Sequence, residues 1–216
     1  PVEQVPGFSS GLFSVQDAAA QRAAVLLGAQ HGMRVLDACA APGGKTAHIL
    51  ELADVNLCAL DVDENRLARV GANLDRLSLM SEQVTLQRAD AANLDAWWDG
   101  RHFDRVLADV PCTASGVVRR HPDIRWLRRE ADIARTVSLQ ASILDALWTT
   151  VKPGGRMLYV TCSVFPEEGV LQADHFQGTH SDAQLLPSPG QLLPEPYDGL
   201  KGLYDGFFFA LFAKRV

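Results

Sequence analysis

Two of the four cysteines in this 216-residue chain lie where a reactive thiol is expected. Cys112 lies in Asp-Val-Pro-Cys-Thr and Cys162 in Val-Thr-Cys-Ser, and each follows an apolar run with the pattern of a buried strand. A cysteine that only fills a core behaves as a small apolar residue, whereas these two have polar or turn residues beside them. The thiolate is the reactive form, and a helix N-terminus, such as the one predicted after Cys162, favours it. The pair therefore indicates thiol chemistry.

The other two cysteines fit a packing role. Cys58 lies inside an apolar strand pattern, and Cys39 lies among small residues. The sequence has no C-x-x-C pair and its six histidines form no metal-ligand pattern, so we expect no metal site. We also expect the thiols to stay reduced, as they do in an intracellular protein.

Residues 37–46, Asp-Ala-Cys-Ala-Ala-Pro-Gly-Gly-Lys-Thr, form a candidate ligand loop between a short apolar strand and a helix pattern. Glycines let a ligand approach the backbone, and free N–H groups at a helix N-terminus attract negative charge. The dinucleotide fingerprint G-x-G-x-x-G does not match. A phosphate-binding P-loop, G-x-x-x-x-G-K-[ST], matches Gly44-Lys45-Thr46 but has Cys39 in place of its first glycine. A loop for S-adenosyl-L-methionine (SAM), D-x-x-x-x-P-G-G, also matches, and the loop alone leaves these two interpretations, or a plain tight turn, open.

Acidic residues end three of the predicted strands. Asp61 follows the second strand about 20 residues beyond the glycine turn, where a carboxylate can bind ribose hydroxyls. It could instead cap the next helix, but Asp63 can do that, so we favour a ligand role for Asp61. Asp90 follows the third strand, where it could bind an adenine amino group or simply form a turn. Asp109 ends the fourth strand, shortly before Cys112.

A run of arginines with an aromatic residue follows Cys112. Its members are Arg119, Arg120, Arg125, Arg128 and Arg129, with His121 and Trp126 among them. Arginine binds phosphate and stacks on bases, so the run is a candidate RNA-binding patch, although a solvated helix face is the alternative. The net charge of the chain is −6, so any contact with nucleic acid must be local or come from parts outside this chain.

Apolar periodicity and turn residues predict strands that alternate with helices, which is typical of an α/β doubly wound sheet. The predicted strands cover residues 35–36, 56–60, 83–88, 103–108, 156–160 and 206–212, with a further strand near 184–186. The predicted helices cover 14–27, 45–52, 63–77 and 133–151, with helical pieces at 94–98 and 124–130 and another that opens at 166. Ser14-Val-Gln-Asp17 resembles a capping box that starts the first of these helices, and Lys152-Pro-Gly-Gly155 is expected to break the one at 133–151. Loops are expected at 1–13, 113–120 and 187–206. If the fourth and fifth strands are neighbours, both reactive thiols share one sheet edge with the glycine loop.

The composition is that of a globular protein, with 47% apolar residues. No apolar run approaches membrane-spanning length and no signal peptide opens the chain, so we expect a cytoplasmic protein without a membrane partner. The first residue is proline rather than methionine, from which we expect a fragment of a longer protein.

The chain resembles the NOL1/NOP2/Sun family of RNA cytosine-5 methyltransferases. Three stretches carry the resemblance: Ala-Cys-Ala-Ala-Pro-Gly-Gly-Lys-Thr at 38–46, Asp-Val-Pro-Cys-Thr-Ala-Ser-Gly at 109–116 and Thr-Cys-Ser-Val-Phe-Pro-Glu-Glu at 161–168. Residues 116–129 look closest to the bacterial Sun branch of this family, which modifies 16S ribosomal RNA. The resemblance runs from Phe8 to the last strand. Members of that branch carry an additional N-terminal NusB-like RNA-binding domain, so the resemblance implies that this chain is the C-terminal catalytic portion.

The resemblance implies a Rossmann-like class I SAM-dependent methyltransferase fold, with a mostly parallel doubly wound sheet and an antiparallel C-terminal strand. Residues 1–33 would be an extension and helix leading into a catalytic domain at 34–216. Asp61 would hold the ribose of SAM, Asp90 the adenine amino group, and Asp109 would lie near both the cofactor and the cytosine. The methionine part would lie in the backbone of Cys39, Ala40, Ala41, Pro42, Gly43, Gly44 and Lys45. The implied enzyme acts on 16S ribosomal RNA in the cytoplasm, needs no metal and is a monomer.

The family pattern also assigns the two thiols. Cys162 would attack C6 of the cytosine and thereby make C5 nucleophilic, and Cys112 would help to release the product. DNA cytosine-5 methyltransferases instead use a Pro-Cys cysteine, which would make Cys112 the nucleophile. The departures from the family pattern are Val110, Ala89 and Gly169, none of which is a reacting group. The rival functions are a P-loop-like ATPase, and an RNA-binding ribosome assembly factor without catalytic activity.

Overall fold

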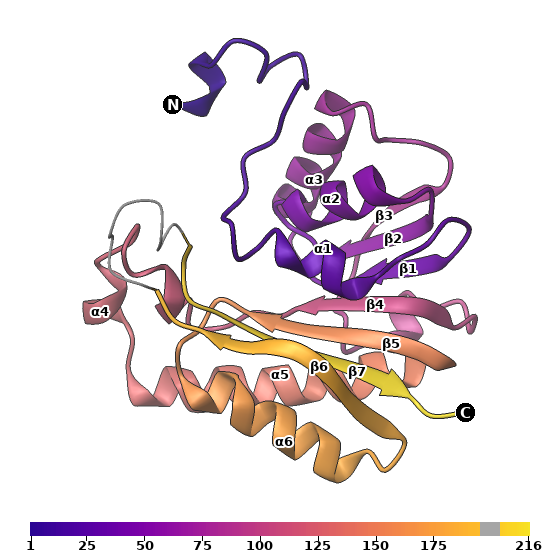
Figure 1. The fold of residues 1–216 in the computed structure, drawn as a ribbon, viewed down its shortest axis with the longest axis vertical. Helices are drawn as coiled ribbons and strands as arrows, with labels where there is room; N and C mark the ends of the chain where they lie inside the picture. The colour runs from indigo at the N-terminus through magenta and orange to yellow at the C-terminus, as the bar shows by residue number, and fades with distance from the viewer. Residues whose placement is uncertain (195–203) are drawn as a thin grey trace.

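A seven-stranded sheet forms the centre of the computed structural model, which describes residues 1–194 and 204–216 (Figure 1). Its strand order is β3-β2-β1-β4-β5-β7-β6. The first five strands run parallel to one another, and β7 is antiparallel to both of its neighbours, as predicted for the C-terminal strand. The strands are β1 (Arg34–Asp37), β2 (Asn56–Asp61), β3 (Val84–Arg88), β4 (Phe103–Asp109), β5 (Val151–Thr161), β6 (Ala183–Leu192) and β7 (Phe207–Lys214).

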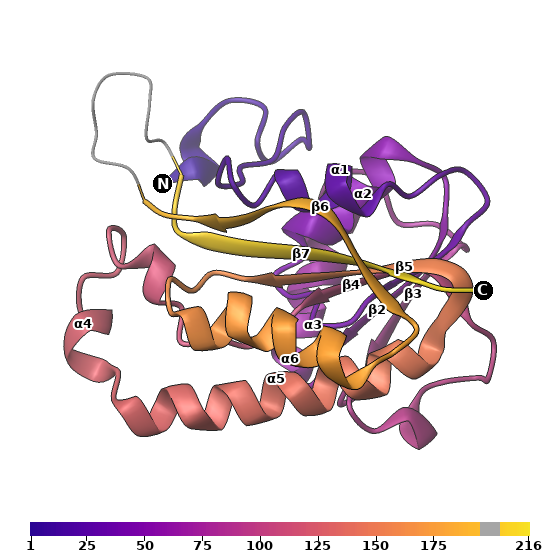
Figure 2. The same ribbon diagram turned by 60° about the horizontal axis from the view of Figure 1, so that its bottom comes forward.

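Helices cover both faces of this sheet. Figures 1 and 2 show α1, α2 and α3 on one face and α5 with α6 on the other. The helices are α1 (Arg22–Leu27), α2 (Gly44–Leu52), α3 (Glu64–Arg76), α4 (Ile124–Leu127), α5 (Glu130–Thr150) and α6 (Val170–Thr179). Short 3₁₀ helices lie at Val2–Gln4, Leu94–Ala96, Ser115–Val117 and Pro166–Glu168. The predicted doubly wound α/β architecture is confirmed.

Successive residues of the central strands enter different cores, because side chains alternate across a sheet. In β4, Leu107 packs into the core beneath α1, α2 and α3, and its neighbour Val106 packs into the core beneath α5 and α6. In β5, Leu158 and Tyr159 divide in the same way, and all four side chains are inaccessible to solvent. The sheet is therefore fixed from both sides, and its strand ends form a rigid edge on which a site can be built.

Parallel register brings the predicted site residues to that edge. Asp37 aligns with Leu107 of β4, and Asp109 aligns with Val160 of β5. The prediction that β4 and β5 are neighbours is confirmed, so the chain that follows each strand leaves the sheet at one place. The glycine loop after β1 leaves from the same edge.

The helix predicted at 14–27 is wrong in its first half, because α1 begins only at Arg22. Asp17 was expected to stabilise a helix start, but its carboxylate accepts hydrogen bonds from the backbone N–H of Ala19, at 2.9 Å, and of Asp205, at 3.0 Å. The second bond ties residues 14–21 to the entry of β7. A tertiary contact thus replaces the helix that local pattern favoured.

Two further predictions need correction in the second half of the chain. Residues 152–155 were predicted to be a break, but β5 begins at Val151 and contains them, with an irregularity where the register to β4 shifts. The loop predicted at 187–206 begins later than expected, because β6 continues to Leu192 through a second register shift. Proline is tolerated there because β6 is an edge strand. The rest of this loop prediction falls largely on residues 195–203, outside the described residues.

Candidate active site

A cavity of about 420 Å³ opens at the carboxyl ends of the parallel strands. It contains most of the acidic and thiol residues that the sequence singled out. The predicted site residues in its lining are Cys39, Ala41, Asp61, Asp90, Asp109, Cys112 and Cys162. Of the residues that the structure describes, Ala40, Pro42, Gly43, Gly44, Lys45 and the five arginines lie outside this lining. The cavity has two halves. Cys39, Asp61 and Asp90 line the half at the carboxyl ends of β1 to β3, which is called the cofactor half below, and Cys112 and Cys162 line the other, which is called the thiol half.

The glycine loop is packed tightly onto neighbouring elements. Gly43 has a φ of 98°, and a Cβ built there would lie 3.0 Å from Cα of Val70 in α3, so glycine is required by both conformation and space. The backbone N–H of Ala40 donates to the carbonyl of Leu60 in β2 at 2.8 Å. The loop is therefore held between β2 and α3 with its outer surface toward the cavity. Gly44 meets only side-chain atoms of Gln16, the nearest at 3.6 Å, so it is not required by space.

Asp61 lies at the wall of the cavity with only 3% of its surface exposed. Its carboxylate accepts from the backbone N–H of Asp63, at 3.0 Å, and of Ala41, at 3.3 Å, and it lies 3.5 Å from Arg66. Asp63 caps α3 with its own side chain, as the sequence indicated. Asp61 is thus free of the capping role and connects the glycine loop to the end of β2.

Asp90 forms a turn, which is one of the two alternatives that the sequence left open, and it also lines the cavity. Its carboxylate accepts from the backbone N–H of Ala92 at 3.0 Å, which is a turn contact. The same residue lines the cavity, next to Asp61. The turn holds the carboxylate at the cavity edge.

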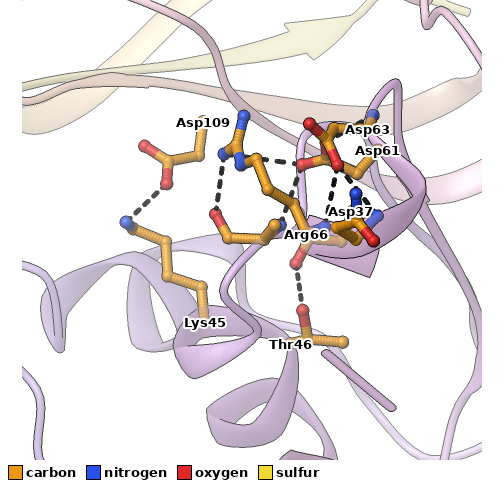
Figure 3. A network of polar contacts seen from close by, with 9 residues as sticks. Asp37, Lys45, Thr46, Asp61, Asp63, Arg66 and Asp109 are labelled. Carbon is orange, nitrogen blue, oxygen red and sulfur yellow. Dashed lines mark hydrogen bonds and ion pairs between the residues drawn. The ribbon is translucent and has the colours of Figure 1, made fainter. Parts of the chain in front are cut away.

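Asp37 lies beneath the loop and is almost completely buried. Thr46 donates a hydrogen bond to its Oδ2 at 2.7 Å, whereas its Oδ1 has no partner among the described residues (Figure 3). Burial raises the pKa of Asp37 to about 7, although the bond from Thr46 opposes this and the charge of Asp109 adds to it. The side chain is an acceptor that the surrounding protein leaves incompletely bonded.

The charges around the loop fit a cationic ligand better than a phosphate. Burial raises the pKa of the Cys39 thiol, and the carboxylates of Asp109, Asp37 and Asp61 raise it further because they disfavour a second negative charge nearby. A nucleotide triphosphate would meet the same repulsion. SAM carries a sulfonium and an ammonium group, and the residues present fit it.

Lys45 has a role that the sequence did not indicate, because its side chain rather than its backbone contributes. Its Nζ lies 2.6 Å from Oδ2 of Asp109 (Figure 3). Burial opposes the charged form, but the charge of Asp109 and its hydrogen bond outweigh burial and raise the pKa of Lys45. In a P-loop this lysine would be available for phosphate, so the ion pair disfavours that interpretation. The partners are 64 residues apart, and no local pattern predicts such a pair.

Cys112 and Cys162 are brought together with their sulfur atoms 3.5 Å apart. The pKa of Cys162 is lowered by a hydrogen bond from Cys112 and by the nearby charge of Lys45, against the opposing effects of burial and of Asp109. The pKa of Cys112 is raised by the same hydrogen bond, by burial and by the charge of Cys162. The environment therefore favours Cys162 as the thiolate and Cys112 as the thiol that donates to it.

The two remaining thiols differ from this pair. Burial raises the pKa of Cys58 to about 11, and Cys58 lies in β2 against the core beneath α5 and α6. Cys39 lines the cavity, but its raised pKa makes a thiolate unfavourable. Both environments agree with packing roles.

Some arginines of the run bond other parts of the chain, and others lie exposed on the surface. Arg120 donates to the buried carboxylate of Asp205 at 2.7 Å, and Arg119 lies 3.6 Å from the same group. Arg128 donates to the carbonyl of Thr113 at 2.7 Å, which ties α4 to the chain beside Cys112. The guanidinium of Arg125 lies 5.9 Å from the ring centroid of Trp126, which is 80% exposed. Arg129 is also exposed and is the N-cap residue of α5.

Two buried carboxylates near the thiols were not singled out by the sequence. Glu168 and Asp205 are both fully buried. Glu168 belongs to the Pro-Glu-Glu stretch and Asp205 to the loop predicted at 187–206, and their partners Thr113 and Arg120 lie 55 and 85 residues away. Burial of a carboxylate in a turn cannot be read from local pattern.

The fold and the position of the cavity together define the class of protein to which this chain belongs. A mostly parallel sheet with a final antiparallel strand, and a ligand loop after β1, is the fold of class I SAM-dependent methyltransferases. The chain belongs to the family described as 16S rRNA methyltransferase RsmB/F, whose model matches residues 24–197.

Relatives and solved structures agree with this assignment. The chain is 50% identical over 215 residues to ribosomal RNA small subunit methyltransferase B of Vibrio cholerae serotype O1, covering 99% of this chain and 49% of that protein. The structure of NSun6 from Pyrococcus horikoshii with SFG matches at a TM-score of 0.86 and 28% identity, over 99% of this chain and 56% of that one. A methyltransferase homologue from Pyrococcus horikoshii matches at 0.82 and 31%, over 99% and 72%. The chain thus spans about half the length of its curated relatives.

Residues 1–194 and 204–216 contain neither a candidate membrane span nor a candidate metal site. No helix there combines the length and hydropathy needed to cross a bilayer. No group of three or more histidine, cysteine or acidic side chains there is arranged to hold a metal ion.

Proposed function

We propose that this chain transfers a methyl group from SAM to C5 of a cytosine in 16S ribosomal RNA, through a covalent adduct between Cys162 and C6. The observation that carries the proposal is the thiol pair, 3.5 Å apart, in a cavity that Asp61 and Asp90 also line. The family description supports ribosomal RNA as substrate. A relative solved with SFG, a SAM analogue, supports the cofactor.

The half of the cavity beneath β1 to β3 would hold SAM, which supplies an electrophilic methyl group. Asp61, fixed by two backbone N–H groups, would accept hydrogen bonds from the ribose hydroxyls. Asp90 would accept from the adenine amino group. The methionine part would lie along the backbone of residues 39–45. Each of these roles uses an acceptor that the fold already holds at the cavity wall.

Addition begins with the Cys162 thiolate. Its sulfur forms a bond to C6 of the cytosine, and the electron pair of the C5–C6 double bond moves toward C5 and the ring. Asp109, which lines the cavity, is proposed to lie against the ring at N3. The proton shared by Lys45 and Asp109 would move toward N3 as negative charge develops there. Carbon C5 is then nucleophilic and forms a bond to the methyl group, while the bond between that group and the sulfonium sulfur breaks and leaves its electron pair on S-adenosylhomocysteine. The target base must be unstacked to reach this pocket.

Release requires loss of the C5 proton and breakage of the bond between Cys162 and C6. Two of the causes that raise the pKa of Cys112 are its hydrogen bond to Cys162 and the charge of that thiolate. Both disappear when Cys162 is bonded to carbon. Cys112 therefore becomes more acidic at the step that needs a base, and as a thiolate it can take the C5 proton directly or through water. The electrons of the C5–H bond re-form the double bond, and Cys162 leaves as a thiolate.

The RNA is proposed to cross the surface around α4. Arg125, Arg129 and the exposed ring of Trp126 offer phosphate binding and base stacking. Arg128 connects this surface to the chain that carries Cys112. Arg119 and Arg120 would add positive charge near the cavity while they bind Asp205.

Trapping with RNA that contains 5-fluorocytosine tests the proposal, because fluorine at C5 blocks the release step. We expect the wild-type chain to form a stable protein–RNA adduct with SAM present, and Cys162→Ala to form none. With ordinary cytosine, Cys112→Ala should accumulate an adduct that the wild type resolves. The reverse pattern in the two variants would move the nucleophile to Cys112.

Calorimetry distinguishes this function from the P-loop ATPase. We expect SAM and S-adenosylhomocysteine to bind and ATP not to bind.

A tritiated-methyl assay tests the alternative of an assembly factor without activity, which would transfer no label. Bisulfite sequencing of 16S ribosomal RNA with and without the gene would identify the nucleotide. We further propose a cytoplasmic monomer, which sedimentation and cell fractionation test.

A further inference from the structure

The carboxylate of Glu168 is completely buried directly behind the thiol pair, and the mechanism above does not use it. It lies in the 3₁₀ turn Pro166–Glu168 that follows β5. Two of its hydrogen bonds come from Thr113, the residue after Cys112: the backbone N–H donates at 2.9 Å and the hydroxyl at 2.5 Å. A buried carboxylate with several donors is a rigid anchor, because every donor would be left unpaired if it moved.

Helix α5 completes the set of donors. The hydroxyl of Thr136 donates to Glu168 at 2.7 Å, and the side-chain amide of Gln140 donates at 3.1 Å. The same amide group of Gln140 donates to the carbonyl of Pro111 at 2.9 Å. Cys112 is thus bracketed: the residue before it is bonded to Gln140, and the residue after it is bonded to Glu168.

The anchor is itself fixed from β5. The hydroxyl of Tyr159 lies 2.7 Å from the backbone carbonyl of Glu168, and the hydroxyl of Thr161 donates to that carbonyl at 3.1 Å. Cys162 is the next residue after Thr161. One turn therefore connects the strand that delivers Cys162 with the loop that delivers Cys112.

We propose that Glu168 is a positioning residue that holds Cys112 against Cys162 for the release step of the reaction. The inference rests on the proposed function, since it assigns Cys112 to release. Addition of Cys162 to C6 uses Cys112 only as a hydrogen-bond donor that favours the thiolate, which Lys45 favours as well, and Cys162 follows β5 directly. Release needs Cys112 itself at the C5 proton. A change at Glu168 should therefore affect release more than addition. The charge of Glu168 also contributes to the raised pKa of Cys112.

Glu168→Gln tests the proposal with an unmodified 16S ribosomal RNA transcript and tritiated SAM. The amide keeps the shape but turns one acceptor into a donor that faces other donors. We expect protein–RNA adduct to accumulate with ordinary cytosine, as in Cys112→Ala, and release of methylated RNA to slow at least tenfold. Label should enter the adduct at a rate within a few-fold of wild type. Glu167→Gln is the matched control, since Glu167 is the exposed neighbour, and it should behave as wild type.

Thr113→Val is the second variant, in case Glu168→Gln does not fold. It removes one donor to Glu168 and keeps the shape of the side chain, so we expect the same accumulation to a smaller extent. Equal slowing of addition and release in both variants would overturn the inference. So would release at the wild-type rate in folded Glu168→Gln. If Cys112→Ala itself accumulates no adduct, the proposed role of Cys112 fails and the inference fails with it, whereas accumulation in Cys112→Ala alone removes only the inference.

Discussion

The cofactor half and the thiol half of the cavity each rest on a buried carboxylate, but the two carboxylates are supported differently. Asp37, beneath the glycine loop, receives one hydrogen bond from Thr46, nine residues away, and its Oδ1 has no partner in the described part of the chain. Glu168, behind the thiols, receives bonds from Thr113, Thr136 and Gln140, which lie on two other segments. The carboxylate of the cofactor half is held by a residue nearby in the sequence. The carboxylate of the thiol half is held by residues distant in the sequence, whose contacts form only when the sheet is assembled.

The number of residues between hydrogen-bonded partners also differs between the two halves. In the cofactor half, Asp61 binds Ala41 across 20 residues. In the thiol half, Thr113 binds Glu168 across 55 residues and Arg120 binds Asp205 across 85. We expect substitutions in the cofactor half to change SAM affinity or local stability. Substitutions in the thiol half should change rates with little effect on SAM affinity.

Lys45 belongs to the glycine loop by sequence and to the thiol half by its contact with Asp109. A large effect of Lys45 on cofactor affinity would therefore contradict the division between the two halves. Lys45→Met removes the charge beside Asp109 and Cys162. We expect kcat for methyl transfer to fall about 10³-fold, or about 4 kcal/mol, the size expected for losing one charge-stabilising group. The Kd for SAM should change less than threefold in calorimetry. A large rise in that Kd with unchanged kcat would place Lys45 in the cofactor half after all.

Asp37 gives the second largest effect, on stability rather than on rate. Its pKa is about 7 in the folded chain, against 3.8 as the ordinary value. Between these values the folded chain binds a proton that the unfolded chain has lost, so stability falls as pH rises. From pH 5 to pH 8 the wild type should lose about 3 kcal/mol relative to Asp37→Asn, which cannot titrate there. Urea unfolding at both pH values without SAM measures this. Parallel pH dependence in the two proteins would contradict it.

Asp61 tests whether a residue of the cofactor half acts on SAM affinity alone. Asp61→Ala removes a carboxylate proposed to bind ribose and also frees the N–H of Ala41. We expect SAM affinity to fall about 30-fold, or about 2 kcal/mol, in calorimetry. Trapping by 5-fluorocytosine RNA should return to the wild-type extent when SAM is saturating. Asp63→Ala is the control: it should cost about 1 kcal/mol of stability as a lost helix cap, with unchanged affinity.

The division also explains what the sequence could predict. The doubly wound α/β sheet followed from alternating elements, and the positions of Asp61 and Asp90 in the cavity lining followed from their places after strands, because those signals are local. The close approach of Cys112 and Cys162 required only that β4 and β5 be neighbours. Glu168, Asp205 and the Lys45 side chain could not be found in this way. Each is defined by a partner distant in sequence, and the failed helix start at Asp17 has the same cause.

The arginine run provides the smallest expected effect and tests where the thiol half ends and the RNA surface begins. Arg125→Gln and Arg129→Gln change exposed side chains, so we expect RNA affinity to fall a few-fold. The slope of log affinity against log salt should fall by about 0.7 for each lost phosphate contact with single-stranded RNA. Stability should stay within about 0.5 kcal/mol of wild type.

Arg120→Gln should behave differently, because its partner Asp205 is fully buried. Removing one partner leaves that carboxylate with fewer donors, and Gly206, next to Asp205, is bonded to Gly116 in the loop after Cys112. We expect a loss of stability of about 1–2 kcal/mol, smaller than for a fully buried pair because the arginine is half exposed. Filter binding across a salt series and urea unfolding measure the two quantities. A variant of Arg120 that lowers only the salt slope would place this arginine on the RNA surface and move the boundary of the thiol half inward.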